Sequence, residues 1–258
     1  MKDNRKSLII LLPIIILSFL SIKAEAYAQS RSSEDIQAFT DRVYTRFTDN
    51  CSKTIELTYK SQTLTSPDRN KSIYFETIVR NIGDRNYNGS SACVIESGQT
   101  PVAKIVISSG SNQRAENFIS LVGNQYNLAN KAAILTPVSW SANSRYVIVR
   151  VDYVLGYDFL TDHLILDSQN NYRQINLGSN NIPCANAGAG GELLGFTSST
   201  VVAFSCGEFG DPGYIEVVNL GNRSISRVNN LGNISRLQTY GMITSNHSIR
   251  KIQEFPGR

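Results

Sequence analysis

A recurring order of segments is the feature that most constrains the fold of this chain. Three times, a short strand-like run, a turn rich in Ser and Asn, and a longer apolar run follow one another. The copies are TLTSPDRNKSIYFETIV (63–79), PVSWSANSRYVIVRVDYV (137–154) and LLGFTSSTVVAFSC (193–206). Further strand-like runs follow them, at 93–96, 163–167 and 214–220. This recurrence predicts several small sheets, one for each copy.

From Cys51 onward the apolar residues alternate with polar ones, which is the spacing of strands with one buried face. Clusters of Gly, Asn, Ser, Asp or Pro separate these runs roughly every 8–12 residues. The clearest expected strands are 54–61, 72–80, 102–108, 146–154, 201–205 and 214–220. Residues 115–134 fit either a short helix or a loop followed by a strand. We therefore expect a mainly β, mostly antiparallel domain with short hairpin connections.

One amphipathic helix is expected before the strands begin, over residues 33–48. Four apolar residues at spacings of three and four place one stripe along it: Ile36, Phe39, Val43 and Phe47. The stripe is expected to pack on the rest of the domain, and the alternative is a helix that binds a partner.

The N-terminus has the pattern of a secretory signal peptide. Lys2, Arg5 and Lys6 precede an apolar stretch that begins at Leu8, and Ala26-Tyr27-Ala28 fits the cleavage pattern. The stretch of about 15 residues is shorter than the roughly 20 needed to cross a bilayer. We expect cleavage after Ala28, no membrane span in the mature chain, and a periplasmic or secreted location in a bacterium. The alternative is an envelope component tethered by an uncleaved signal.

The charge argues against a nucleic-acid partner. Residues 1–28 carry four bases and two acids, so the formal charge falls from +4 to +2 on cleavage. The remaining chain is long enough for one domain with a sizeable core.

The chain has four cysteines, Cys51, Cys93, Cys184 and Cys206, all in the exported part. An even number in an oxidising compartment suggests two disulfides, for which three pairings are possible. We favour Cys51–Cys93 and Cys184–Cys206, because each pair stays within one local unit. A zinc site is the alternative, but the spacings include no C-x-x-C, and the two histidines are expected in turns or at the surface.

The second copy resembles one blade of the WD-like β-propeller repeat of TolB-type periplasmic proteins. In that family an aromatic-Ser-Pro-Asp-Gly turn leads into an apolar strand, and the next strand ends in Asp. Trp140-Ser141-Ala142-Asn143 occupies the turn, and 164–167 ends in Asp167. Ser66-Pro67-Asp68 matches the turn more literally, and the third copy, beginning at Phe196, is degenerate.

The resemblance implies a propeller-like stack of small antiparallel sheets and carries no catalytic residue across. A propeller needs at least about four blades. We therefore expect 54–61, or C-terminal strands near 236–243 and 249–255, to complete another sheet, unless the fold is an open relative. The expected organisation is a signal peptide (1–28), an N-terminal helix (29–50) and a propeller-like domain (51–258).

One loop has the form of a calcium site. Asp84, Asn86 and Asn88 stand at alternate positions before Gly89, as in D-x-N-x-N-G loops. Glu96 lies one place too late for the last ligand of a helix-flanked loop, and an Asn/Gly hairpin turn explains the same residues. Calcium is the only cofactor that the sequence suggests, in a structural role.

No residues form a clear catalytic group. Asp152, Asp158 and Asp162 cluster near His163 and suit an acid–base group, but we expect them to be solvated loop charges. From Asn219 onward six cations stand against Glu254 alone, an excess that suits either an acidic partner or the polar faces of surface strands: Arg223, Arg227, Arg236, Arg250, Lys251 and Arg258.

The favoured hypothesis for function is an exported, non-catalytic protein that binds a protein or another macromolecule of the cell envelope. Its rival is an envelope hydrolase that acts on glycan or peptide through loop carboxylates such as Asp152, Asp158 or Asp211.

Overall fold

The computed structural model describes residues 38, 40–45, 51–83, 102–118, 133–155, 158–177, 182–185, 191–207, 213–228 and 237–257. Contacts divide the chain into two units, residues 1–42 and 43–258, and every described strand belongs to the second. Of the predicted helix, residues 40–45 are helical, with Val43 and Tyr44 buried. The predicted signal peptide lies outside the described residues, as does the greater part of the predicted helix.

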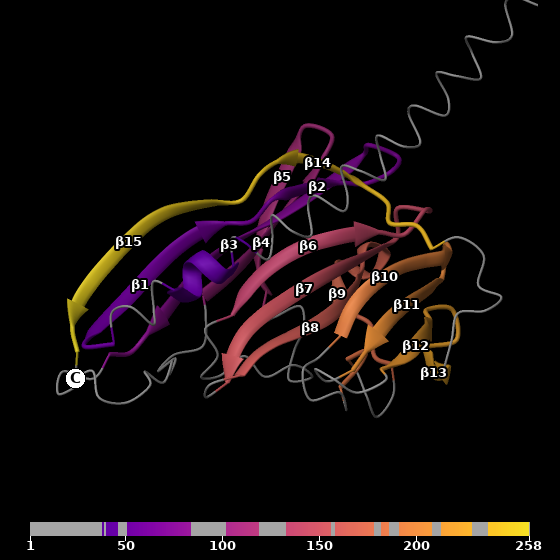
Figure 1. Cartoon of the computed structure of the whole chain (residues 1–258). Coiled ribbons are helices and arrows are strands. Elements are labelled where there is room, and N and C mark those ends of the chain that lie inside the picture. Colours follow the sequence, from indigo (N-terminus) through magenta and orange to yellow (C-terminus); the bar gives the residue numbers. More distant parts are fainter. Residues whose placement is uncertain are drawn as a thin grey trace, which may run out of the picture. The chain divides into compact units, whose positions relative to one another are not determined.

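The described chain is mainly β and forms three antiparallel sheets, which we number by the three copies of the repeat (Figure 1). The second sheet is a four-stranded meander of β6 (Ile134–Trp140), β7 (Tyr146–Leu155), β8 (Asp158–Asp167) and β9 (Arg173–Gln174), with the short 3-10 helix η2 (Ser168–Asn170) before β9. The third is a meander of β10 (Gly191–Ser198), β11 (Val201–Cys206), β12 (Tyr214–Asn219) and β13 (Ser224–Val228).

The first sheet contains a meander of the same kind, extended along one edge. Its strands are β2 (Thr63–Thr65), β3 (Lys71–Asn81), β4 (Val102–Ser109) and β5 (Asn112–Asn117). Beside β2, strand β1 (Lys53–Lys60) pairs with the other half of β3. From the C-terminus, β14 (Met242–Ser245) pairs with β2 and β15 (Ser248–Pro256) pairs with β1. The 54–61 run and the C-terminal strands therefore extend the first sheet, and the expectation that they complete another sheet was wrong, because their backbone groups pair with β2, β3 and each other.

The second sheet is buried on both faces. Val147, Val149 and Val151 of β7 share one core cluster with residues of the first sheet such as Phe75. Ile148, between them in sequence, belongs to a cluster with residues of the third sheet, including Phe196, Val202 and Phe204. A strand with two buried faces is apolar at successive positions, which explains the apolar run that opens β7, from Tyr146 to Val149.

In the first sheet, the turn between β2 and β3 is closed by its own side chains. Ser66 Oγ accepts a hydrogen bond from the Lys71 amide at 3.0 Å, and it donates one to Asp68 Oδ1 at 2.5 Å. The same Asp68 oxygen accepts from the Asn70 amide at 3.1 Å. Short polar side chains that bond nearby backbone groups stabilise tight turns of this kind.

In the second sheet, the turn between β6 and β7 has the same network. Ser141 Oγ accepts from the Tyr146 amide at 2.9 Å and donates to Asn143 Oδ1 at 2.7 Å. The residues at the equivalent left-handed position are Arg69, with φ of 59°, and Ser144, with φ of 56°. The sequence similarity of the first two copies therefore corresponds to the same local structure.

Residues 237–245, which we call the crossing segment, connect all three sheets. Alternate residues pair with the last residue before the first turn of each sheet: Gln238 with Phe196, Tyr240 with Trp140 and Met242 with Thr65. The Phe196 amide donates to the Gln238 carbonyl at 2.7 Å, and the Trp140 amide donates to the Tyr240 carbonyl at 2.8 Å. In Figure 1 this yellow segment passes the ends of β10 and β6 before it becomes β14.

Trp140 is the largest side chain at this junction and is completely buried. Its indole Nε1 donates to the Leu64 carbonyl of the first sheet at 3.3 Å, and its ring meets Tyr172 edge-on at 6.3 Å. Its own strand belongs to the second sheet, so this one residue joins two sheets and the crossing segment.

We predict that Gly241→Ala destabilises the protein more than Gly110→Ala does. Both glycines have positive φ, +110° and +59°, so each substitution carries a backbone cost of about 1–2 kcal/mol. A Cβ at 241 would also lie 3.0 Å from the Thr65 carbonyl oxygen and from Trp140 Cδ1, whereas one at 110 meets open space. Urea unfolding should show an additional loss of about 1–2 kcal/mol for Gly241→Ala. Equal losses would show that the crossing segment is not tightly held.

Candidate functional site

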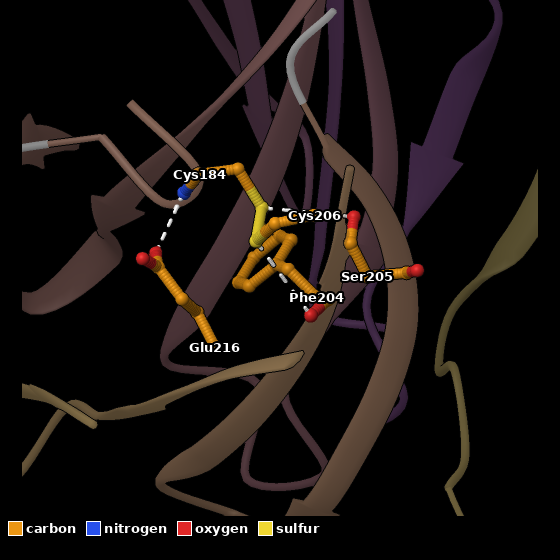
Figure 2. Close-up of a disulfide and its surroundings, with 5 residues drawn as sticks. All are labelled: Cys184, Phe204, Ser205, Cys206 and Glu216. Atoms are coloured by element: carbon orange, nitrogen blue, oxygen red, sulfur yellow. Dashed lines mark hydrogen bonds between the residues drawn. A yellow bond between two sulfur atoms is a disulfide. The ribbon is translucent and has the colours of Figure 1, made fainter. Parts of the chain in front are cut away.

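A buried disulfide and a carboxylate form the first candidate cluster (Figure 2). Cys184 and Cys206 are joined with a Cα–Cα distance of 5.2 Å, and their exposures are 1% and 0%. Glu216, on β12, is only 7% exposed, and its Oε2 accepts a hydrogen bond from the Cys184 amide at 2.7 Å. Gly191 leaves room for the bridge, because a Cβ there would lie 2.4 Å from Cys184 Sγ.

The same three side chains have a spacing that suits a metal. Among the described residues, Cys184, Cys206 and Glu216 place their sulfur and carboxylate atoms within 4.8 Å of one another. Zinc binds cysteine as thiolate, however, and here both sulfurs are used in the disulfide. The cluster therefore acts as a covalent link between residues 182–185 and the third sheet, with Glu216 capping the linked turn.

The other disulfide is seen at one end only. Cys51 is disulfide-bonded, and its predicted partner, Cys93, lies outside the described residues. The predicted calcium ligands Asp84, Asn86 and Asn88 also lie outside them. Calcium binding therefore stays a prediction.

Arg150 and Asp152, both on β7, form a largely buried ion pair, which corrects the expectation of a solvated loop charge for Asp152. Asp152 is 3% exposed, and its Oδ1 lies 2.7 Å from Arg150 Nε and accepts from Thr161 Oγ1 at 2.7 Å. Both strands are interior strands of the second sheet, so these side chains lie in its packed layer. The burial of Asp152 was not predicted because polar residues near an expected turn are usually exposed.

His163 is buried as well, and not in a turn or at the surface as expected. His163, on β8, is opposite Arg150 of β7. The centroid of its ring lies 5.3 Å from that of Phe204 in the third sheet. Burial, together with the positive charge of Arg150, lowers the pKa of His163 to about 3. The imidazole is therefore neutral near pH 7 and fills space between two sheets.

Of the other carboxylates in the predicted group, the structure describes the side chain of Asp162 only. Asp162 is half-buried, and its hydrogen bond and charge, after the larger effect of burial, help raise the pKa of Tyr153. The side chain of Asp158 and all of Asp211 lie outside the described residues.

Strand register places two turns of every meander at one end, and we call these six turns the turn face. Lys71 of β3 is opposite Ser109 of β4, Tyr146 of β7 is opposite Asp167 of β8, and Val201 of β11 is opposite Asn219 of β12. Each pair brings the first and the third hairpin turn of its meander together. The turns are residues 66–71, 110–111, 141–146, 168–172, 197–200 and 220–223.

Hydrogen bonds fix the turns of the first two sheets against each other. Lys71 Nζ donates to the Ser144 carbonyl and to Ser168 Oγ, both at 3.0 Å. The Asp68 amide donates to Ser144 Oγ at 3.1 Å. In the third sheet Arg223 is near enough to Tyr146 of the second to act on its pKa, which burial chiefly raises.

The turn face is polar and carries an excess of arginine. Arg69, Arg173 and Arg223 are exposed, one from each sheet, and no carboxylate in the described part of the chain forms an ion pair with them. Arg145, by contrast, is held by Asp167 at 2.8 Å. Of these three, only Arg223 was noticeable in the sequence, among the cations that follow Asn219, because a sequence does not show the strand register that brings the other two to the same end.

No protein-family model, curated protein or solved structure matches this chain. Among the described residues, no helix is long and apolar enough to cross a membrane. The buried Cys184–Cys206 disulfide is compatible with an extracellular protein.

Removing the buried disulfide should cost about 3 kcal/mol, because the bridge spans 22 residues and restricts the unfolded chain accordingly. We predict that Cys184→Ala with Cys206→Ala lowers the free energy of unfolding, measured in urea, by this amount. The control Glu216→Gln keeps an oxygen acceptor for the Cys184 amide and should cost less. A double variant as stable as the parent would contradict a structural role for the bridge.

Stability should fall on acidification partly because of His163. Its folded pKa of about 3 lies below the ordinary 6.5, so between these values the unfolded chain binds a proton that the folded chain does not. Unfolding free energies from pH 7 to pH 4.5 should fall more steeply for the parent than for His163→Gln, by up to about 1.4 kcal/mol per pH unit below pH 6.5. Parallel curves for the parent and His163→Gln would refute the assignment.

Proposed function

We propose that this chain is an exported, non-catalytic binding protein whose turn face recognises a protein or another macromolecule of the cell envelope. Within the proposal, its body is an open relative of the WD-like, TolB-type propeller, and the mature chain is periplasmic or secreted after cleavage of the signal peptide.

Three observations support the propeller relationship. Each copy of the repeat corresponds to one four-stranded antiparallel meander, the usual size of a propeller blade. The second sheet packs face to face on the other two. The first two copies share the same turn network, centred on Ser66 and Ser141.

The observation that carries the binding proposal is the turn face itself. It consists of exposed polar turns that hydrogen bonds such as Lys71 to Ser144 hold in place. A fixed set of loops on a rigid scaffold suits recognition, because little conformational entropy is lost when a partner binds.

The hydrolase alternative is weakened by the buried ion pair. Asp152, one of its three expected carboxylates, is bound by Arg150 and Thr161 within the layer between sheets, where a glycan or peptide substrate has no access. Structural ion pairing explains this carboxylate without catalysis.

The test is capture of envelope components on the immobilised mature protein, with variants that obstruct the turn face. Ala142 and Asn170 are exposed turn residues, and Lys104 is an exposed residue in the middle of β4, away from the turns. We predict that Ala142→Trp with Asn170→Trp reduces the captured component at least about tenfold, because the bulky rings exclude a partner from a surface where a tight fit is needed. Lys104→Trp should capture as much as the parent.

Unfolding curves will establish that all variants are folded. Equal capture by parent and turn-face variant, or an empty eluate from every extract, would count against the proposal.

A further inference from the structure

We propose that the partner of the turn face is an acidic polysaccharide, whose carboxylates are bound by Arg69, Arg173 and Arg223. This inference rests on the proposed function and names the chemical class of the partner.

The three arginines lie at turns of successive sheets. Arg69 lies in the first turn of its sheet, between β2 and β3, Arg223 lies in the third turn of its sheet, between β12 and β13, and Arg173 directly follows the third turn of the second sheet. All three are exposed, and none forms an ion pair in the described chain, because Asp167, which is opposite Arg173, is paired with Arg145. An extended partner that follows the turn face would therefore meet one guanidinium from each sheet.

Two of these arginines stand where an arginine is conformationally unfavourable. Arg69 has φ of 59° and Arg223 has φ of 60°, in the left-handed region that glycine or asparagine adopts more readily. Neither side chain makes a hydrogen bond or ion pair within the described protein that would compensate for this backbone. Unfavourable backbone conformations of this kind cluster at binding sites.

The chemistry of arginine then points to an anion with fixed geometry. A guanidinium can bind a carboxylate through two parallel hydrogen bonds, and it stays charged at every physiological pH. A single exposed pair of this kind contributes little. A polymer that carries a carboxylate on many of its sugars can engage three arginines at once, and the linked contacts then add to a useful affinity.

The rest of the turn face favours a polysaccharide over an acidic protein. Its exposed residues are short and polar, such as Asn70, Asn143 and Asn170, which suit the hydroxyl groups of sugars. The large exposed hydrophobic side chains of the described chain lie on strands, not in these turns: Ile78, Met242, Ile252 and Phe255. Tight protein interfaces are usually centred on apolar or aromatic anchors, which the turns lack.

The experiment measures binding of the full mature chain to three probes by calorimetry: polygalacturonate, neutral dextran and poly-glutamate. We expect binding to polygalacturonate, at least tenfold weaker binding in 300 mM than in 50 mM NaCl, and none to dextran. The variant Arg69→Gln, Arg173→Gln, Arg223→Gln should lose at least about tenfold in affinity. A matched control, Lys104→Gln, Arg250→Gln, Lys251→Gln, removes the same charge from strands of the first sheet and should stay within about twofold.

A second variant separates binding from stability. Arg69→Gly with Arg223→Gly relieves the positive φ at both turns, so it should raise the midpoint of urea unfolding while it weakens binding to polygalacturonate. A lower midpoint would show that the two arginines serve the fold, which would overturn the proposal.

Other outcomes are also decisive. Equal losses in the charge-matched control would reduce the effect to net charge, and binding to poly-glutamate without polygalacturonate would identify an acidic protein as partner. Either outcome would overturn the inference of an acidic polysaccharide. The proposed function would still stand if the turn-face variant lost capture of an envelope component. If no probe binds and the capture experiment is also empty, both proposals are wrong.

Discussion

The backbone hydrogen bonds of the crossing segment are the interaction on which the arrangement of the three sheets depends. Each meander is completed by local hairpins, but β6 and β10 are edge strands, whose free backbone groups need partners. Gln238 and Tyr240 supply those partners at the ends of both strands. Residues far along the chain therefore cover the ends of two edge strands that no hairpin of their own sheets covers.

The sequence predicted the parts of the fold that local chemistry determines. Apolar residues, alternating in half-buried strands such as β3 and successive in the doubly buried β7, located β3, β4, β7, β11 and β12 to within a residue or two of their ends. β5, with the sequence NQRAEN, was missed because it is a polar strand whose residues are nearly all exposed. The crossing of the C-terminus over three sheets was not predictable either, since it depends on contacts between residues more than 40 positions apart.

The candidate site follows the same division. The Cys184–Cys206 bridge was the pairing favoured from sequence, because a local disulfide follows from spacing and compartment. Asp152 and His163 were interpreted as solvated or surface residues because polar residues near turns usually are. The structure buries both, and Phe204 of the third sheet packs against the His163 ring. The turn face was missed for a related reason: neighbouring turns come from parts of the chain that only strand pairing brings together.

The topology of the first sheet also constrains the order in which its strands can pair during folding. β1 and β2 are synthesised well before β14 and β15, which pair with their outer edges and lie more than 170 residues further along the chain. Until then, one long edge of the nascent sheet has no partner and is open to pairing with other chains. Strands so far apart in the sequence pair slowly. The unpaired edge is therefore open to aggregation for part of each folding event. Separation of each chain from other copies until β15 has paired with β1 would therefore reduce aggregation.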